Sequence, residues 1–428
     1  MNKNLPFSLF LALFFFVASV FESKAQCPDG RYQNRIFPNA ISVTSLPSAV
    51  VYGEAENYQG NMETLDMYVA QPQGDVQATR PLVIMAFGGS FLQGVKESPD
   101  IIYIINELTR RGYVTASIKY RLGASPVNTT NMMAAVIRGV HDMRAAVRFF
   151  YKDADTDNNY RIDTTQIFIG GVSAGGFIGL HAAFLQDDSV MPSWMQAIVD
   201  SLGGYEGNSG NPGYSSKVKG VINLSGAIGD TAWITPTNAV PVLNMHGDQD
   251  GTVPFNSDTI VVSGQRILDV DGSNVIKDRL NDLGVYNIFH NYVGQDHVPF
   301  VQELPFALIG LPTPHLDATI DSTVKFLLNL VECDSTVSTN LSIEERIFTN
   351  IYPNPSENLV NIEIKNVDDF ERLTMDIYDG VGRLVQSVTN LTNSVYQLNK
   401  DEFGAGIYFV NIYEGNKQFQ VTKKVIFK

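Results

Sequence analysis

Short, continuous apolar runs alternate with longer amphipathic stretches through the middle of the chain. The runs predict buried strands at residues 82–87, 113–120, 166–170, 218–224, 240–245 and 285–292. The stretches between them predict helices at residues 101–111, 131–151, 174–185, 264–283 and 316–330. Strands without polar alternation, separated by helices, indicate a mostly parallel sheet that helices cover on both faces. We therefore expect an α/β fold here.

The pattern changes after Cys333. A polar stretch over residues 334–350 reads as a linker, and period-two alternation then appears at residues 359–364, 373–378 and 407–413. Asp-Gly and Glu-Gly turns separate these segments. The alternation predicts a small all-β sandwich over residues 351–428.

Composition narrows the classes of function. The chain has 428 residues, more than one ordinary domain needs, with 44% hydrophobic and 18% charged residues. Its 30 basic and 45 acidic side chains give a net charge of −15. Such a charge disfavours nonspecific binding to nucleic acid or anionic lipid, so we expect a neutral or hydrophobic substrate.

The N-terminus has the pattern of an export signal. Lys3 precedes an apolar stretch over residues 9–21, and small residues near Ala25 suit cleavage before Gln26. A membrane anchor is the alternative, but the apolar stretch is shorter than the roughly 20 residues that a bilayer span needs. We expect residues 1–25 to be removed, which leaves no stable membrane span and a catalytic domain over residues 26–333.

The chain contains two cysteines, Cys27 and Cys333. In an exported protein such a pair suggests a disulfide, here between an N-terminal extension and the end of the α/β domain. Two unconnected thiols are the alternative.

The most specific motif is Gly-Val-Ser-Ala-Gly-Gly at residues 171–176, between a predicted strand and a predicted helix. This context is typical of a nucleophile elbow, where Ser173 occupies a strained turn and glycines avoid collisions. A tight turn without a catalytic role is the alternative. The glycine-rich run at residues 87–91 supports function, because backbone N–H groups there can stabilise a developing oxyanion. The candidate donors are the N–H groups of Gly89, Ser90 and Ala174.

A serine nucleophile needs a base, and the base needs an orienting carboxylate. In an elbow fold the acid and the histidine follow the serine, on loops after later strands. Asp250 is the candidate acid, with Asp248 on the same loop as the alternative. His297 is the candidate base, because it lies just past a predicted strand. The other downstream histidines are His290, within that strand, and His315, ahead of the last helix; His246 reads as support for the acid loop, and His141 and His181 as helix residues.

Residues 50–332 resemble the α/β-hydrolase superfamily, and its carboxylesterase and hormone-sensitive-lipase-like branch in particular. The resemblance rests on the elbow, on Tyr-Arg-Leu at 120–122, and on the His-Gly-x-x-Asp-x-x-Val-Pro motif at 246–254. Phe87 stands where many such enzymes have histidine, and Ser90 replaces a third glycine, so the oxyanion loop departs from the family pattern. The resemblance implies no metal and no organic cofactor.

The last 80 or so residues resemble the C-terminal sorting domain of the type IX secretion system of Bacteroidetes. The motifs that carry this resemblance are Tyr-Pro-Asn-Pro, Ile-Tyr-Asp, Gly-Arg-Leu-Val, Gly-Ile-Tyr-Phe-Val and a basic end, at residues 352–355, 377–379, 382–385, 406–410 and 423–428. A carbohydrate-binding or adhesion sandwich is the alternative. The resemblance implies secretion or display at the cell surface, with the secretion machinery as a partner.

Two further segments leave alternatives open. Asp153, Asp155 and Asp157 have the spacing of a calcium loop but lack its glycine and its final carboxylate, so a solvated loop is the simpler interpretation. The segment 199–217 borders the active site as a lid, or is an ordinary surface loop.

The sequence therefore predicts a secreted serine esterase that acts on a small-molecule or polymer-linked ester through an acyl-enzyme on Ser173. A peptidase or amidase on the same fold is one alternative. A catalytically silent surface-binding protein is the other.

Overall fold

The computed structural model describes residues 27, 30–186, 189–308, 311–332, 348–365, 373–380, 382–414 and 419–428. The chain divides into two compact units after residue 333, and each is considered by itself. No helix in the described ranges is long and apolar enough to cross a bilayer.

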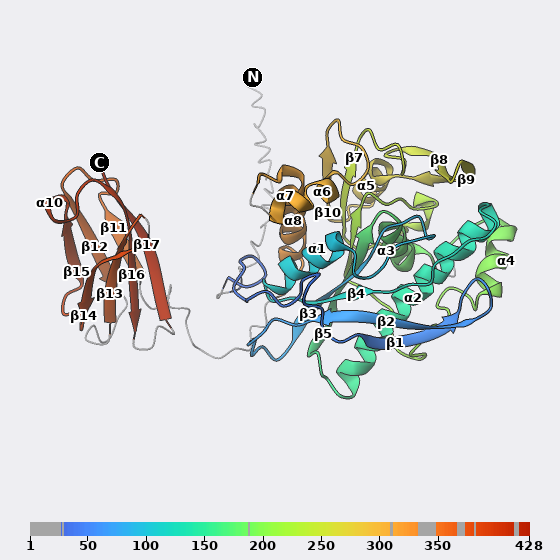
Figure 1. Ribbon diagram of the computed structural model, residues 1–428, viewed down its shortest axis with the longest axis horizontal. Coiled ribbons are helices and arrows are strands. Elements are labelled where there is room, and N and C mark those ends of the chain that lie inside the picture. The colour runs from blue at the N-terminus through green and yellow to red at the C-terminus, as the bar shows by residue number, and fades with distance from the viewer. Residues whose placement is uncertain are drawn as a thin grey trace, which may run out of the picture. The chain divides into compact units, whose positions relative to one another are not determined.

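The first unit is built on an eight-stranded sheet with the strand order β1-β2-β4-β3-β5-β6-β7-β10 (Figure 1). Its strands are β1 Val50–Glu56, β2 Met62–Ala70, β3 Arg80–Ala86, β4 Val114–Ile118, β5 Ile162–Val172, β6 Gly220–Leu224, β7 Val242–Gly247 and β10 Asn287–Tyr292. Strands β4, β3, β5, β6, β7 and β10 run parallel, whereas β2 pairs antiparallel with both β4 and the edge strand β1. The predicted α/β architecture and its six apolar strands are confirmed.

Helices cover both faces of this sheet, as its buried strands require. On one face α1 Pro99–Thr109 packs against β3 and β4, and α8 Pro314–Leu328 packs against β7 and β10. On the other face lie α2 Thr129–Asp155, α3 Ala174–Phe184 and α5 Ser273–Asp282. The shorter helices are α4 Ser193–Ser201, the 3-10 turn η1 Thr231–Trp233, α6 Pro299–Gln302 and α7 Leu304–Leu308. Every residue of α3 is buried, so this helix is a core element directly behind β5 and β6.

One predicted helix is wrong in its first half. Residues 264–283 begin with a strand, because β8 Ser257–Val262 and β9 Gln265–Asp271 form an antiparallel hairpin, and only α5 is helical. Ser263 and Gly264 both have positive φ, 49° and 76°, the conformation of a type I′ hairpin turn. The hairpin stands apart from the large sheet (Figure 1).

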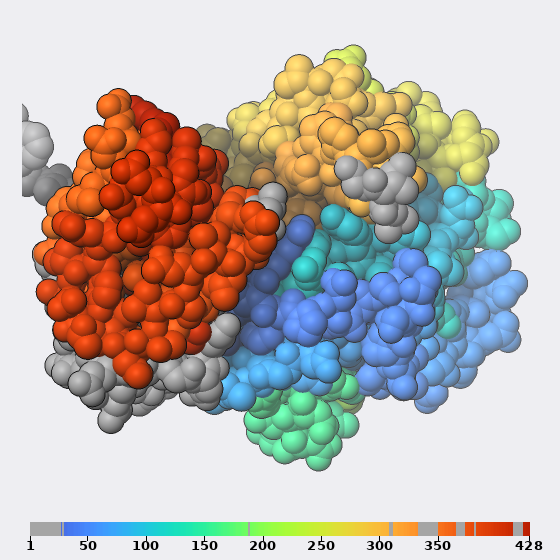
Figure 2. All heavy atoms as spheres, turned by 60° about the vertical axis from the view of Figure 1, so that its left-hand side comes forward, coloured from blue at the N-terminus to red at the C-terminus, as the bar shows by residue number. Residues whose placement is uncertain are grey.

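The segment after residue 30 lies along α1 and the turn that follows it. The N–H groups of Tyr32 and Phe37 donate to the carbonyls of Arg111 and Arg110, and Arg35 forms an ion pair with Glu107 at 2.6 Å. Figure 2 shows this early part of the chain, in blue, at the surface of the first unit.

Cys27 is buried, at 4% exposure. Cys333 lies outside the described residues, so the disulfide stays a prediction. The export signal at residues 1–25 lies outside them as well.

The second unit is a small β domain, as predicted. It has a three-stranded sheet, β11-β12-β15, and a four-stranded sheet, β14-β13-β16-β17. The strands are β11 Phe348–Tyr352, β12 Leu359–Lys365, β13 Leu373–Asp379, β14 Leu384–Thr389, β15 Val395–Asn399, β16 Gly406–Glu414 and β17 Phe419–Phe427, with one helical turn, α10 Lys400–Phe403. Alternate side chains from both sheets form its own core, including Ile362, Met375 and Val410.

Candidate active site

Ser173 occupies a sharp turn between β5 and α3. Its φ of 54° and ψ of −116° are strained for a residue with a side chain. A Cβ on Gly171 or Gly175 would lie 2.3 or 2.0 Å from the carbonyl oxygen of Ala86 on the neighbouring strand. Only glycine fits on both sides of the serine, which is the steric reason for the motif.

The structure brings Ser173, His297 and Asp250 together from three distant stretches of sequence. His297 Nε2 lies 2.9 Å from Ser173 Oγ, and His297 Nδ1 lies 2.6 Å from Asp250 Oδ2. The three residues follow β5, β7 and β10, whose carboxyl ends meet at one edge of the sheet. Chemically, this is a hydroxyl beside an imidazole whose other nitrogen is fixed by a carboxylate.

Asp250 is buried and fully hydrogen-bonded. Its Oδ1 accepts bonds of 2.8 Å from the backbone N–H groups of Thr252 and Val253. Its Oδ2 accepts from His297 and also from His246 Nε2, 3.0 Å away. Burial by itself would raise the pKa of Asp250, but the hydrogen bonds from His246 and His297 outweigh it and hold the pKa below its usual range. The carboxylate therefore stays ionised at neutral pH.

His246 continues the chain of hydrogen bonds behind Asp250. Its Nδ1 lies 2.8 Å from Ser273 Oγ, which in turn lies 3.1 Å from Asn223 Nδ2. His246 Nε2 faces two groups that can only accept, Asp250 Oδ2 and the carbonyl of Val253 at 3.1 Å, so the imidazole proton sits on Nε2 and Nδ1 accepts from Ser273 Oγ. The sequence indicated His246 only as general support for the loop. Its direct contact with the carboxylate depends on folding.

Two other aspartates join the loops that carry Asp250 and His297. Asp296 Oδ1 accepts from the N–H of Gly251 at 2.9 Å and from the N–H of His297 at 2.7 Å. Asp248, the alternative acid, accepts from Gly294 N at 2.8 Å and Asn291 Nδ2 at 3.1 Å, so it holds the base loop instead of the imidazole. These contacts fix the separation of the acid and base loops. Adjacency to His297 was the only sequence signal for Asp296.

The remaining histidines downstream of Asp250 have other partners. His290 lies in β10, where its ring contacts Tyr292. His315 Nδ1 lies 2.6 Å from Glu303 Oε1.

The glycine-rich loop after β3 lies against the elbow. A Cβ on Gly88 would come within 3.2 Å of Ser173 Cβ. Gly89, Ser90 and Phe91 all have positive φ, at 125°, 55° and 62°. Ser90 and Ala174 line the cavity at Ser173, whereas Gly89 does not. Because Ala174 is the first residue of α3, its N–H is one of the donors that a helix leaves without an internal partner.

A narrow cavity of about 70 Å³ opens beside Ser173. Its walls include Phe91, Phe177 and Trp233, the first half of α2, and the β8–β9 hairpin. His181 also lines it, which the sequence did not indicate. Burial lowers the pKa of His181 to about 4, and both ring nitrogens are used, by the carbonyl of Phe177 at 2.7 Å and the N–H of Gly229 at 3.2 Å. The imidazole is therefore a neutral wall residue.

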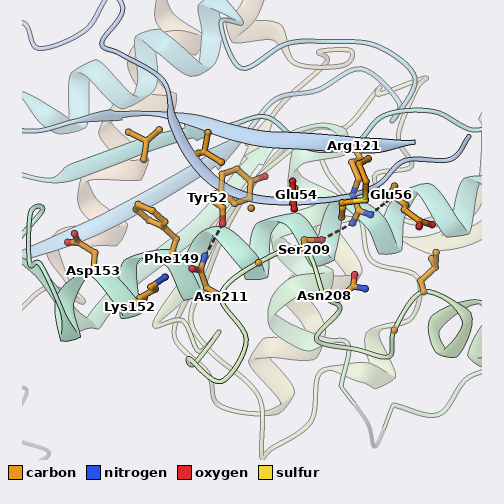
Figure 3. A pocket seen from close by; sticks show the side chains of 18 of the residues that line it. Tyr52, Glu54, Glu56, Arg121, Phe149, Lys152, Asp153, Asn208, Ser209 and Asn211 are labelled. Atoms are coloured by element: carbon orange, nitrogen blue, oxygen red, sulfur yellow. Dashed lines mark hydrogen bonds between the residues drawn. The ribbon is translucent and has the colours of Figure 1, made fainter. Parts of the chain in front are cut away.

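A much larger hollow of about 1160 Å³ lies at the edge of the sheet, between β1, the second half of α2 and the segment after α4. Figure 3 shows Glu54, Asp153 and Asn211 among its lining side chains. Arg121 at its wall donates to Ser209 Oγ at 2.9 Å and to the carbonyl of Glu56 at 2.8 Å. None of Ser173, Asp250 and His297 lines this hollow.

The segment 199–217 contributes to this large hollow and to a neighbouring one, and not to the cavity at Ser173. The lid hypothesis for it is therefore wrong. Its Gly210 packs on β1. The carbonyl oxygen of Ser209 lies 1.9 Å from the position that a Cβ on Gly53 would occupy, so only glycine fits at residue 53.

The carboxylate of Asp153 closes the loop between α2 and β5. It accepts bonds from the backbone N–H groups of Asn159 and Tyr160, each at 3.1 Å, and from Asn159 Nδ2 at 3.0 Å. Within the described ranges, no three His, Cys, Asp or Glu side chains gather as a metal site would require.

An eight-stranded, mostly parallel sheet with a serine in a strained turn after a central strand defines an α/β-hydrolase. Comparison with known families agrees: residues 65–263 match the model named BD-FAE, and residues 350–428 match the model described as secretion system C-terminal sorting domain. The first unit therefore contains an esterase-like α/β-hydrolase domain, and the chain ends in a type IX secretion sorting domain. The BD-FAE match contains Ser173 and Asp250 and ends before His297.

Among solved structures, the chain is similar to esterase 2 of Thermogutta terrifontis. The form phosphorylated by paraoxon has 18% identity and a TM-score of 0.47, over 68% of this chain and 95% of that one. The propionate-bound form has 17% identity and a TM-score of 0.46, over 70% and 97%. No curated protein matches the chain.

Proposed function

We propose that the first unit hydrolyses carboxylic esters through an acyl-enzyme on Ser173, with His297 as the general base and Asp250 as the acid that orients it. The observation that carries this proposal is the continuous hydrogen-bonded series from Ser173 Oγ through His297 to Asp250, at 2.9 and 2.6 Å. The match of residues 65–263 to BD-FAE supports esters over amides as substrates.

In the first step, Ser173 Oγ attacks the ester carbonyl carbon while its proton passes to His297 Nε2. The carbonyl oxygen becomes an oxyanion, which the N–H groups of Ser90 and Ala174 stabilise, with Gly89 as the third predicted donor. The bond between the carbonyl carbon and the alkoxy oxygen then breaks. The alcohol leaves with the proton from His297, and the acyl group stays on Ser173.

In the second step, water replaces the alcohol. His297 takes a proton from the water, whose oxygen attacks the acyl carbon, and the bond to Ser173 Oγ breaks as the proton returns to that oxygen. The products are a carboxylic acid, an alcohol and free enzyme. The scheme uses side chains and backbone N–H groups of this chain, together with water.

The test is the variant Ser173→Ala with p-nitrophenyl acetate and butyrate. The expected loss in kcat is about 10⁴-fold or more, because the nucleophile is gone. A fluorophosphonate probe should label the native protein at Ser173 and leave the variant unlabelled. An unchanged turnover in the folded variant would contradict the proposal, and amide hydrolysis faster than ester hydrolysis would favour a peptidase.

For location, we propose a two-step route of export. The signal at residues 1–25 directs the chain across the inner membrane, and the sorting domain at residues 351–428 then directs it to the type IX secretion machinery. Residues 26–333 would be the catalytic domain and residues 334–350 the linker. Deleting residues 351–428 should retain active esterase inside the cell envelope. Normal secretion of the truncated chain would contradict this route.

A further inference from the structure

The cavity beside Ser173 is lined mainly by apolar side chains. Its lining includes no Asp, Glu, Lys or Arg among the described residues, and its polar members are neutral. Both ring nitrogens of His181, the largest of them, are hydrogen-bonded to backbone groups, so neither is available to a ligand. An ionised or strongly polar group inside the cavity would lose its hydration without compensation. The occupant is therefore an uncharged, apolar group.

The cavity is also short. Its volume of about 70 Å³ is far below the roughly 300 Å³ at which pockets begin to hold drug-sized ligands. Apolar residues from both strands of the hairpin contribute to one wall: Ile260, Val261, Val262, Ile267, Leu268 and Val270. Two contacts hold that wall in place: Thr129 Oγ1 at the start of α2 donates to the carbonyl of Ile267 at 2.7 Å, and Asp271 and Ile228 exchange backbone hydrogen bonds of 3.0 and 2.8 Å.

The position of the cavity relative to His297 decides which half of an ester it can take. Ser90, Ser173 and Ala174 line it, and His297 does not. The alcohol oxygen must lie within reach of His297 to receive its proton as the ester bond breaks. The group in the cavity is then the one on the far side of the carbonyl carbon. The side chain of His297 keeps 17% exposure, so the alcohol side faces solvent.

We propose that this cavity is an acyl pocket for short, uncharged aliphatic acyl groups, and that the β8–β9 hairpin limits their length. The alcohol half of the substrate stays in solvent, so esters of large alcohols, including polymers, are accepted. This inference rests on the proposed function, because it assumes that Ser173 forms an acyl-enzyme.

The test compares two methionines of α2. Met132 lines the cavity and is 4% exposed, whereas Met143 is fully buried on the same helix and lies elsewhere. Met132→Ala lengthens the cavity, and Met143→Ala removes the same side chain away from it. For each variant kcat/KM is measured with p-nitrophenyl acetate, butyrate and octanoate. The ratio between two esters does not depend on the fraction of folded enzyme, so a loss of stability does not distort it.

The native enzyme should prefer acetate to octanoate by at least about tenfold, since overfilling a closed apolar pocket by even one methylene costs that much. Met132→Ala should reduce this preference by about tenfold or more, and Met143→Ala should leave it unchanged. Ile267→Ala tests the hairpin wall of the same cavity, and it also serves if Met132→Ala in the α2 wall does not fold. A native preference for octanoate, or equal ratios in both methionine variants, would overturn the acyl pocket.

A second arm tests the alcohol side. Acetylated dextran should be deacetylated by the native enzyme, as a soluble small acetate is. Failure on the polymer with normal turnover of p-nitrophenyl acetate would overturn the solvent-exposed alcohol side. If no ester is hydrolysed and the fluorophosphonate probe does not label Ser173, the proposed function fails and this inference with it. Labelling and turnover with a flat chain-length profile would overturn the acyl pocket alone.

Discussion

The two hollows of the first unit differ in size and in chemistry. The one at the edge of the sheet holds about 1160 Å³ and is lined by carboxylates and amides together with apolar side chains such as Val51 and Phe149, whereas the one at Ser173 holds about 70 Å³, is mainly apolar and has no charged residue in its lining. Ser173 in its strained elbow lines the smaller one, and the hydrogen-bonded His297 and Asp250 lie beside that serine. Volume alone would have selected the wrong hollow, because reactivity depends on a pre-organised group in a dry environment.

The largest expected effect is on kcat, which should depend on residues at the small cavity and not on residues that line the large hollow. Asp250→Asn should lower kcat for p-nitrophenyl acetate by about 10⁴-fold, because an amide in place of the carboxylate disturbs the orientation and tautomer of His297. Glu54→Gln, in the lining of the large hollow, should leave kcat within a factor of two. A comparable loss in both variants would assign catalysis to a wider region than the small cavity.

The next effect is on stability and belongs to the large hollow. Arg121 at its wall is buried against Asp142, with a shortest distance of 2.7 Å, and Ser209 Oγ donates to the same carboxylate at 2.8 Å. Asp142→Ala should lower the free energy of unfolding by about 3 to 5 kcal/mol, because it leaves an uncompensated buried guanidinium.

Urea unfolding measures that change. Asp278→Ala, which removes an exposed partner of Lys277, is the matched control and should cost at most about 1 kcal/mol. Equal costs for the two variants would mean that the buried pair contributes no more than a surface pair.

A smaller effect concerns the histidine behind the acid. His246→Leu removes one of two imidazole donors to Asp250 Oδ2 and should lower kcat by about 10- to 100-fold, with little change in KM. His246→Gln keeps an N–H donor at the same reach and should recover part of the loss. If the leucine and glutamine variants lose stability alone, with kcat intact, His246 supports only the loop.

The last effect is shared by both regions and depends on pH. Burial lowers the pKa of His141, near the large hollow, to about 3, and that of His181, at the small cavity, to about 4. Their ordinary value is about 6.5, so between these limits the unfolded chain binds more protons than the folded one. Stability should therefore fall as the pH drops from about 6.5 toward 4.

Urea unfolding between pH 7.5 and 4.5 measures this slope. His141→Gln or His181→Gln should make it shallower by removing one of the two groups. The lowered pKa of Asp250 adds nothing in this window, because its contribution is lost only below its unfolded value of about 3.9. A slope that stays the same in both variants would assign the acid sensitivity to other groups.

The sequence predicted an element correctly wherever its pattern of residues suited only one kind of structure. Central strands such as β3 and β5 are buried on both faces, so their apolar runs were unambiguous. The serine motif could be recognised because the sharp turn at Ser173 has no room for side chains at the glycine positions on either side. Residues 264–271 were misread as the start of a helix, because apolar residues at 267, 268 and 270 suit a helix and a hairpin alike, and the Ser-Gly turn at 263–264 was the signal to use.

Contacts between distant segments were beyond the sequence. His181 reads as a residue of an all-apolar helix, and only the packing of α3 against Gly229 and Trp233 turns it into a cavity wall. Likewise, Asp296 and Asp248 look like solvated charges, and their role in joining the acid and base loops depends on where β7 and β10 end.

The hairpin that walls the acyl cavity is one short, continuous stretch of chain, rooted through Asp271 and attached to none of the strands that carry the reacting groups. Its inward residues can therefore change without altering the backbone beneath the serine, the imidazole or the carboxylate. Selectivity and reactivity are encoded in separable pieces of the gene. Replacing this stretch with the corresponding hairpin of a related enzyme would therefore change the acyl groups that the enzyme accepts, in evolution or by engineering.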